Sequence, residues 1–117
     1  MRNMKEMLQE LQEKIGYQFG NEALLKQALT HSSFANEQKI NKLNNYERLE
    51  FLGDAVLELV SSEFLFKENK DMPEGQLTRL RASMVCEPAL AYCARDINLN
   101  SYILLGKGEE ATGGRKR

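Results

Sequence analysis

Three acidic residues at helical spacing are the part of this sequence best suited to chemistry. Glu50 and Asp54 follow Glu47 by three and seven positions. Successive residues of an α-helix are rotated by about 100°, so the three carboxylates fall within about 60° of one another. From Leu49 to Phe66 there are four acids and no lysine or arginine, so no basic side chain one turn away offsets this acid strip. A divalent cation is its natural partner.

A simpler interpretation stays open. Acids in the first turns of a helix oppose its dipole favourably, and a charged strip is often only a solvated face. Against this, Gly53 and Asp54 are both poor helix formers, which costs about 1–1.5 kcal/mol relative to two alanines. The pair therefore suggests a packing or functional reason. Gly53 would let a neighbouring backbone approach closely, and the apolar remainder of the helix predicts a central position in the domain.

Length and composition limit the function classes. The chain has 117 residues, enough for one domain, and is 42% hydrophobic and 28% charged. Sixteen basic and 17 acidic residues give a net charge of -1, so any nucleic-acid surface must be local. No apolar run approaches the ~18 residues of a membrane span, and the N-terminus is not a signal peptide.

The cysteines and the histidine limit the metal chemistry. Cys86 and Cys93 are seven positions apart, and each is expected to be a small buried residue rather than half of a disulfide or metal pair. These residues predict a reducing, cytoplasmic setting. His31 is the sole histidine of the sequence, which excludes a histidine-rich zinc site.

Helices are expected almost throughout. Helical spacing predicts them over 4–15 with a stop at Gly16, over 22–29 behind the cap Asn21, and over 45–69. The break at 72–75 precedes a further helix around 77–85, Pro88 opens one that runs to about Arg95, and 98–105 is expected to hold a short one. Residues 30–34 end the second helix, and 35–44 and 106–117 are predicted loops. With no strand-like alternation, the fold class is all-α.

The basic, glycine-rich end allows two interpretations. Four of the eight glycines fall in residues 106–117. Loops usually connect elements, so this stretch is either a connection to something further or a frayed tail.

Four stretches in order then resemble one family. They are residues 29–33 (LTHSS), 47–57 (ERLEFLGDAVL), 74–82 (EGQLTRLRA), and 105–110 (LGKGEE) with the glycines at 113–114. Together they resemble the catalytic domain of ribonuclease III, an endonuclease that cuts double-stranded RNA. The resemblance covers essentially the whole chain, so residues 1–117 are expected to form the N-terminal portion of this helical domain.

The resemblance implies roles for the acids. Glu50 matches the family's metal-binding glutamate, and Asp54 its catalytic, metal-binding aspartate. Glu47 and Glu74 match two further acids that line the cleavage valley. The implied cofactor is Mg²⁺, with Mn²⁺ as a substitute, which suits ligands that are all oxygen.

The resemblance also implies partners and products. It implies a homodimer whose signature helices pack across the two-fold axis. Each subunit would cut one strand of an RNA duplex, leaving 5′-phosphate and 3′-hydroxyl ends, in the processing of ribosomal and messenger RNA.

The sequence departs from the family pattern in one respect. The family completes its metal site with an Asp and a Glu three residues apart on a later helix, and the printed sequence ends at Arg117 before it. The double-stranded-RNA-binding domain that usually follows is absent from it as well. The chain alone is therefore expected to be inactive. The alternatives are a non-catalytic module of the same family, which binds RNA or pairs with a full subunit, and a plain helical interaction domain.

Two interpretations stay open for the remaining basic candidates, and one is favoured for each of His31 and Tyr46. Arg79 and Arg81 could contact phosphates or pair with an acid such as Glu74. The basic cluster near the end is expected either to bind RNA or to be a solvated loop; it consists of Lys107, Arg115, Lys116 and Arg117. His31 is expected to be structural, with its side chain bonding near a helix end, and Tyr46 to be a packing residue.

Overall fold

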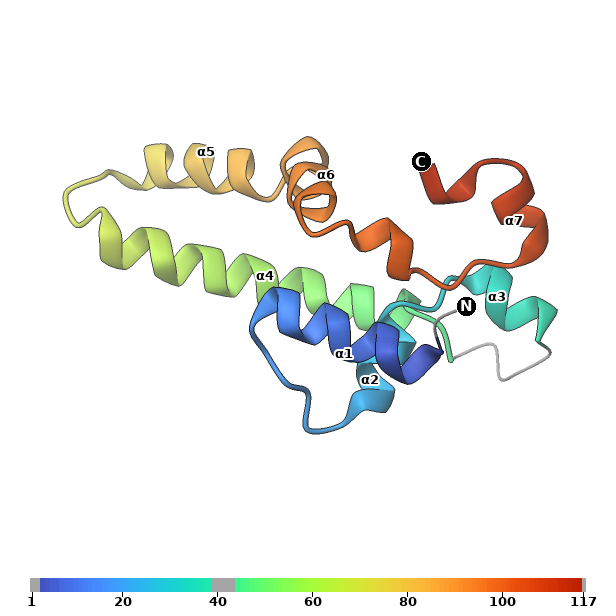
Figure 1. The fold of residues 1–117 in the computed structure, drawn as a ribbon. Coiled ribbons are helices and arrows are strands. Elements are labelled where there is room, and N and C mark those ends of the chain that lie inside the picture. Colours follow the sequence, from blue (N-terminus) through green and yellow to red (C-terminus); the bar gives the residue numbers. More distant parts are fainter. Residues whose placement is uncertain (1–2, 39–43, 117) are drawn as a thin grey trace.

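The computed structural model describes residues 3–38 and 44–116 and shows a helical domain (Figure 1). The elements are α1 (Met4–Ile15), α2 (Glu22–Ala28), α3 (Ser32–Glu37), α4 (Glu47–Glu68), α5 (Glu74–Met84), α6 (Glu87–Asp96), η1 (Leu99–Tyr102), α7 (Lys107–Ala111) and η2 (Gly114–Lys116). In these residues strand-like pairing is limited to one parallel bridge, between Thr30 and Leu104. The all-α prediction is confirmed.

Local signals set the ends of the first two helices, and the predicted stop at Gly16 and cap at Asn21 are confirmed. The side chain of Asn3 accepts a hydrogen bond from the Glu6 backbone N–H at the start of α1. Gly16 ends that helix with φ 70°, a left-handed conformation that glycine adopts without strain. Asn21 caps α2 by accepting from the Ala23 N–H at 3.1 Å.

The hydrophobic core lies in a lobe built by the N-terminal helices and η1. Its buried residues are Leu8, Leu11, Leu25, Leu29 and Tyr102. The Lys14 ammonium lies 5.0 Å from the centre of the Tyr102 ring and donates to the Ile97 carbonyl, and the Tyr102 hydroxyl donates to the Glu10 carboxylate. These contacts join α1 to η1, about 90 residues later, because both ends of the chain share one core.

Helices α4 and α5 form an antiparallel hairpin that projects from this lobe (Figure 1), so the molecule measures 51 × 28 × 25 Å. Ser61 and Leu65 are the buried residues of α4. Arg81 of α5 reaches α4, where it donates to the Ser62 hydroxyl at 2.8 Å and lies 3.6 Å from the Glu58 carboxylate.

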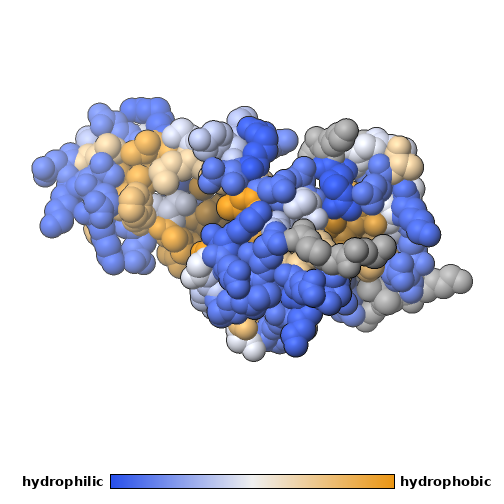
Figure 2. All heavy atoms as spheres, in the orientation of Figure 1, coloured by the Kyte–Doolittle hydropathy of each residue, from blue (hydrophilic) through white to orange (hydrophobic). Residues whose placement is uncertain are grey.

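The prediction of a centrally buried α4 is wrong for this single chain. Phe51 is 83% exposed and Leu59 67%. Figure 2 shows hydrophobic residues exposed along the projecting hairpin. In the described part of the chain α4 packs mainly on α2 and α5, and two helices cover only part of its circumference.

Three further expectations are corrected. Residues 32–37, expected to lie at the junction of a helix end and a polar loop, form α3, while 39–43 of that predicted loop lie outside the described residues. The predicted loop at 106–117 contains α7 and η2. Cys86 and Cys93 are free thiols as expected but exposed rather than buried, because α6 lies on the outside of the fold.

In the described residues no helix is long and apolar enough to cross a membrane.

Arg115 ties η2 to the turn around η1. Its guanidinium donates to the carbonyls of Asn100 (2.9 Å) and Ile103 (2.7 Å) and to the Glu110 carboxylate (2.9 Å). The hydrogen bond from Arg115, and then its charge, lower the pKa of Glu110 below its usual 4.5.

A pH prediction follows from this pair. Because the folded pKa of Glu110 is depressed, the pair contributes stability above the ordinary carboxyl pKa and loses it as pH falls through the folded value. We expect Arg115→Gln to return the Glu110 pKa to its ordinary range in NMR titration. The difference in free energy of unfolding between the wild type and Arg115→Gln should also become smaller below about pH 4. An unchanged Glu110 pKa in the variant would contradict this assignment.

Candidate functional site

The acid strip of Glu47, Glu50 and Asp54 lies on the first half of α4. Ser61 and Leu65 follow Asp54 by seven and eleven positions, so they continue the same face of the helix. That face is buried further along, where α5 covers it. The acids therefore occupy the uncovered half of an otherwise packed face, opposite the exposed apolar side of α4.

The start of α4 is held by several backbone contacts. The Tyr46 N–H donates to the Thr30 carbonyl at 2.9 Å, and the Glu50 N–H donates to the Tyr46 carbonyl at 2.8 Å. The buried side chain of Asn45 accepts from the Glu47 N–H at 2.9 Å. Asn45 was missed as a site-forming residue, although an Asn two positions before a helical acid is a recognisable local capping signal.

The carboxylates of the acid strip are exposed and carry uncompensated charge. Within the described residues none of the three forms a hydrogen bond or an ion pair through its side chain, whereas Glu63 on the same helix pairs with Lys67 at 2.9 Å. Burial of the phenol, followed by the charges of Glu50 and Glu47, raises the pKa of Tyr46. The strip is therefore locally negative and accessible.

This donor set fits a hard divalent cation. All its side-chain donors are carboxylate oxygens, and Mg²⁺ is usually bound through one or two carboxylates, with water and phosphate completing the octahedron. Among the described residues no group of three or more metal-ligating side chains gathers. The acid strip would thus supply only part of a coordination sphere, with the remaining positions left to water and phosphate.

Glu74 lies apart from the other acids. It is at the first turn of α5 and lines a pocket with Ser62 and Phe66, near the far end of α4. Phe66 is 16 residues beyond Glu50, or about 24 Å along the helix axis. The structure therefore does not bring Glu74 to the acid strip within one chain.

Some of the predicted RNA-contact residues are bonded within the chain, and others are exposed. Arg81 and Arg115 both form ion pairs within the chain. For Arg81 this is the predicted pairing with an acid, although the acid is Glu58 and not Glu74. Arg79 and Lys107 are exposed. The Lys116 side chain and Arg117 lie outside the described residues.

The segment 29–33 joins the site to the end of the chain. The His31 N–H donates to the Leu104 carbonyl at 3.0 Å, and the Leu104 N–H to the Leu29 carbonyl at 2.9 Å. The Gly106 N–H donates to the Ser33 hydroxyl at 2.9 Å. A Cβ at Gly106 would lie 2.7 Å from the Ser33 carbonyl, so only glycine permits this approach.

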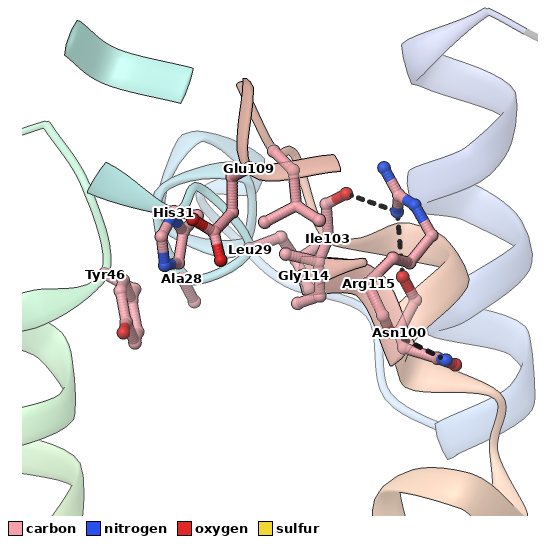
Figure 3. A pocket seen from close by; sticks show the side chains of 10 residues that line it. Ala28, Leu29, His31, Tyr46, Asn100, Ile103, Glu109, Gly114 and Arg115 are labelled. Carbon is pink, nitrogen blue, oxygen red and sulfur yellow. Dashed lines mark hydrogen bonds between the residues drawn. The ribbon is translucent and has the colours of Figure 1, made fainter. Parts of the chain in front are cut away.

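A pocket of about 240 Å³ opens where these segments meet. Figure 3 shows His31 and Tyr46 on one side of it and Asn100 and Arg115 on the other, with Glu109 between. Stretches that are far apart in the sequence thus converge beside the start of α4.

Comparison with known proteins identifies the class. A family model described as Ribonuclease-III-like matches residues 21–117. The chain therefore belongs to the ribonuclease-III-like family. A solved structure of the nuclease domain of ribonuclease III from Campylobacter jejuni matches with a TM-score of 0.83 and 43% identity, covering 94% of this chain and 73% of that one. That structure is described as flexible in a region involved in dimer formation.

Individual relatives carry the name Ribonuclease 3. The protein from Caldanaerobacter subterraneus subsp. tengcongensis is 58% identical over 111 residues, covering 95% of this chain and 48% of its own length. The protein from Oceanobacillus iheyensis is 54% identical over 107 residues, covering 92% and 47%. The chain spans about half the length of these curated relatives.

Proposed function

We propose that this chain is the N-terminal portion of the catalytic domain of a divalent-metal-dependent endoribonuclease that cleaves double-stranded RNA. The observation that carries the proposal is the exposed, uncompensated acid strip on α4, in a chain of the ribonuclease-III-like family. Its cofactor would be Mg²⁺, with Mn²⁺ as a substitute. The processing of ribosomal and messenger RNA in the cytoplasm is the setting that this proposal implies.

Each acid has a role in the proposed reaction. Glu50 and Asp54 would hold the cation, and Glu47, one turn earlier, would orient water and phosphate beside it. When bound there, the cation would lower the pKa of a water and withdraw charge from the phosphoryl oxygens. A water would add to the phosphorus while the bond to the 3′ oxygen breaks. The water would give up one proton and the leaving 3′ oxygen would take one up, which gives 5′-phosphate and 3′-hydroxyl ends.

The exposed side of α4 supports a homodimer. Its apolar residues are each more than half exposed: Phe51, Leu52, Val56, Leu59, Val60 and Phe64. A contiguous apolar face of this kind marks an interaction surface, and a two-fold axis pairs such a face with its own copy. Apart from the two chain neighbours of Gly53 and the adjoining backbone of its own helix, no heavy atom of the described residues lies within 4 Å of where a Cβ at Gly53 would stand, so a second backbone has room to approach there.

The two-fold arrangement also gives Glu74 a role. If α4 packs antiparallel on its copy, the far end of one α4 approaches the first turns of the other. Glu74 of one subunit would then lie nearer the acid strip of its partner than its own. Sites lined by both chains would suit an RNA duplex, which proteins recognise by its shape and 2′-hydroxyls.

The 117 residues alone are proposed to be inactive, because their described part gathers no group of three or more metal-ligating side chains. The second candidate, a non-catalytic RNA-binding or partner-subunit module, rests on the same observation.

Metal-dependent cleavage tests the proposal. A strand-labelled RNA duplex is incubated with the full-length natural protein in Mg²⁺, Mn²⁺ or EDTA, with a single strand of the same sequence as control. We expect cuts in both strands of the duplex, with 5′-phosphate ends, only when a metal is present. Duplex binding without cleavage would favour the non-catalytic module, and cleavage in EDTA would refute the metal role.

A further inference from the structure

His31 stands at the junction between the acid strip and the converging segments, and the proposed chemistry does not use it. Its ring stacks on Tyr46, with ring centres 5.8 Å apart and planes inclined by 22°. This is within the range of favourable aromatic pairs. Tyr46 directly precedes Glu47, and its carbonyl accepts from the Glu50 N–H. The His31 ring thus packs against Tyr46, whose carbonyl accepts the hydrogen bond of the first turn of α4.

The orientation of the His31 ring is set from its other side. Its Nδ1 accepts from the Ser33 N–H at 3.1 Å and lies 2.8 Å from the Ser33 hydroxyl. An Nδ1 that accepts a backbone N–H carries no proton, so the neutral ring is protonated at Nε2. The Ser33 hydroxyl in turn accepts from the Gly106 N–H. The orientation of the imidazole is therefore set by Ser33 of α3 and, through Ser33, by the turn at Gly106, independently of its contact with Tyr46.

We propose that the imidazole ring of His31 is a positioning element for the acid strip, holding the first turn of α4 in place through its stack on Tyr46. Without the ring, the Tyr46 and Glu50 amides would be held by their backbone hydrogen bonds alone. The first turn would then open more often, and Glu47 and Glu50 would lose their fixed spacing relative to Asp54. That the spacing of the acids affects catalysis rests on the proposed function. That the His31 ring stabilises the first turn of α4 does not.

Two substitutions separate the ring from the cap. His31→Asn keeps an oxygen that can accept from the Ser33 N–H, as asparagine does at helix N-termini, but it removes the ring. His31→Phe keeps a ring that can stack on Tyr46 but removes the acceptor. If His31 acts only as the cap of α3, the Asn variant keeps that role and the Phe variant loses it. If the ring positions α4, the Asn variant disturbs the start of α4 and the Phe variant does not.

Residue-resolved amide hydrogen exchange of the protein without metal measures this difference. We expect the Tyr46 and Glu50 amides to exchange about three- to tenfold faster in His31→Asn and near the wild-type rate in His31→Phe. The Ser33 amide should show the reverse pattern. The Leu65 amide, far along α4, should be unchanged in both variants. Wild-type exchange at Tyr46 and Glu50 in the Asn variant, or faster exchange there in the Phe variant, would overturn the proposal.

Kinetics on duplex RNA extend the test to function. His31→Asn should lower kcat about three- to tenfold with little change in KM, and His31→Phe should restore kcat. An unchanged kcat in a His31→Asn protein whose wild type cleaves would overturn the catalytic part of the inference. If the full-length natural protein with wild-type His31 does not cleave at all, the proposed function fails, and the exchange experiment still decides the role of the ring.

Discussion

Replacing Asp54 with asparagine in the full-length natural protein should lower the rate of duplex cleavage by about 10³-fold, because it removes one anionic oxygen from the proposed cation site on α4. Loss of a metal ligand of this kind costs several kcal/mol of transition-state stabilisation, and each 1.36 kcal/mol is a factor of ten. Asn is nearly isosteric with Asp, so duplex binding should be retained. Glu50→Gln should behave in the same way. The measurement is single-turnover cleavage in saturating enzyme and Mg²⁺.

Glu63→Gln is the matched control for these variants. It makes the same change of charge on the same helix, at an exposed residue that pairs with Lys67. Its cleavage rate should stay within about twofold of wild type, since an exposed i,i+4 pair contributes only about 0.3–0.5 kcal/mol. Equal losses in Asp54→Asn and Glu63→Gln would mean that the total charge of α4 matters and not the acid strip.

Placing a lysine at Leu59 should weaken self-association by at least about 100-fold. Leu59 is 67% exposed on the apolar side of α4 and lies away from the acid strip. A two-fold interface would bury the new ammonium group in both subunits without a partner, at a cost of several kcal/mol, and every 1.4 kcal/mol is tenfold in Kd. Sedimentation velocity over a range of concentrations should show a shift from dimer to monomer.

Gln18→Lys controls for added charge. Gln18 is exposed in the loop between α1 and α2, far from the apolar face in the sequence and outside α4. This variant should associate as the wild type does. A wild-type protein that remains monomeric at tens of micromolar, or a Leu59→Lys protein that associates normally, would contradict the α4 interface.

The helices were predictable from the sequence because their ends are local. Asn3, Gly16 and Asn21 act through hydrogen bonds or dihedral angles within a few residues of themselves, so spacing and residue type suffice. Helix α3 was missed because its six residues carry no apolar period, and its cap is the histidine side chain of His31. Histidine is not among the usual capping residues.

The relation of α4 to the rest of the fold was not predictable in the same way. Its all-round apolar character predicts a helix that is buried on many sides, but the sequence does not say against what. In a single chain α2 and α5 cover only part of it. The acid strip followed from spacing, whereas the distance of Glu74 from it follows from the antiparallel course of α5, which no local pattern encodes.

Anomalous scattering from Mn²⁺ in crystals of the protein tests the central claim most directly, because it locates the cation without reference to activity. We expect an anomalous peak within coordinating distance of the Glu50 and Asp54 carboxylates, at about the 2.0–2.2 Å typical of a small hard cation. The peak should be absent in Glu50→Gln crystals grown in the same way. A peak elsewhere in the molecule, or none on α4 in the wild type, would contradict the account.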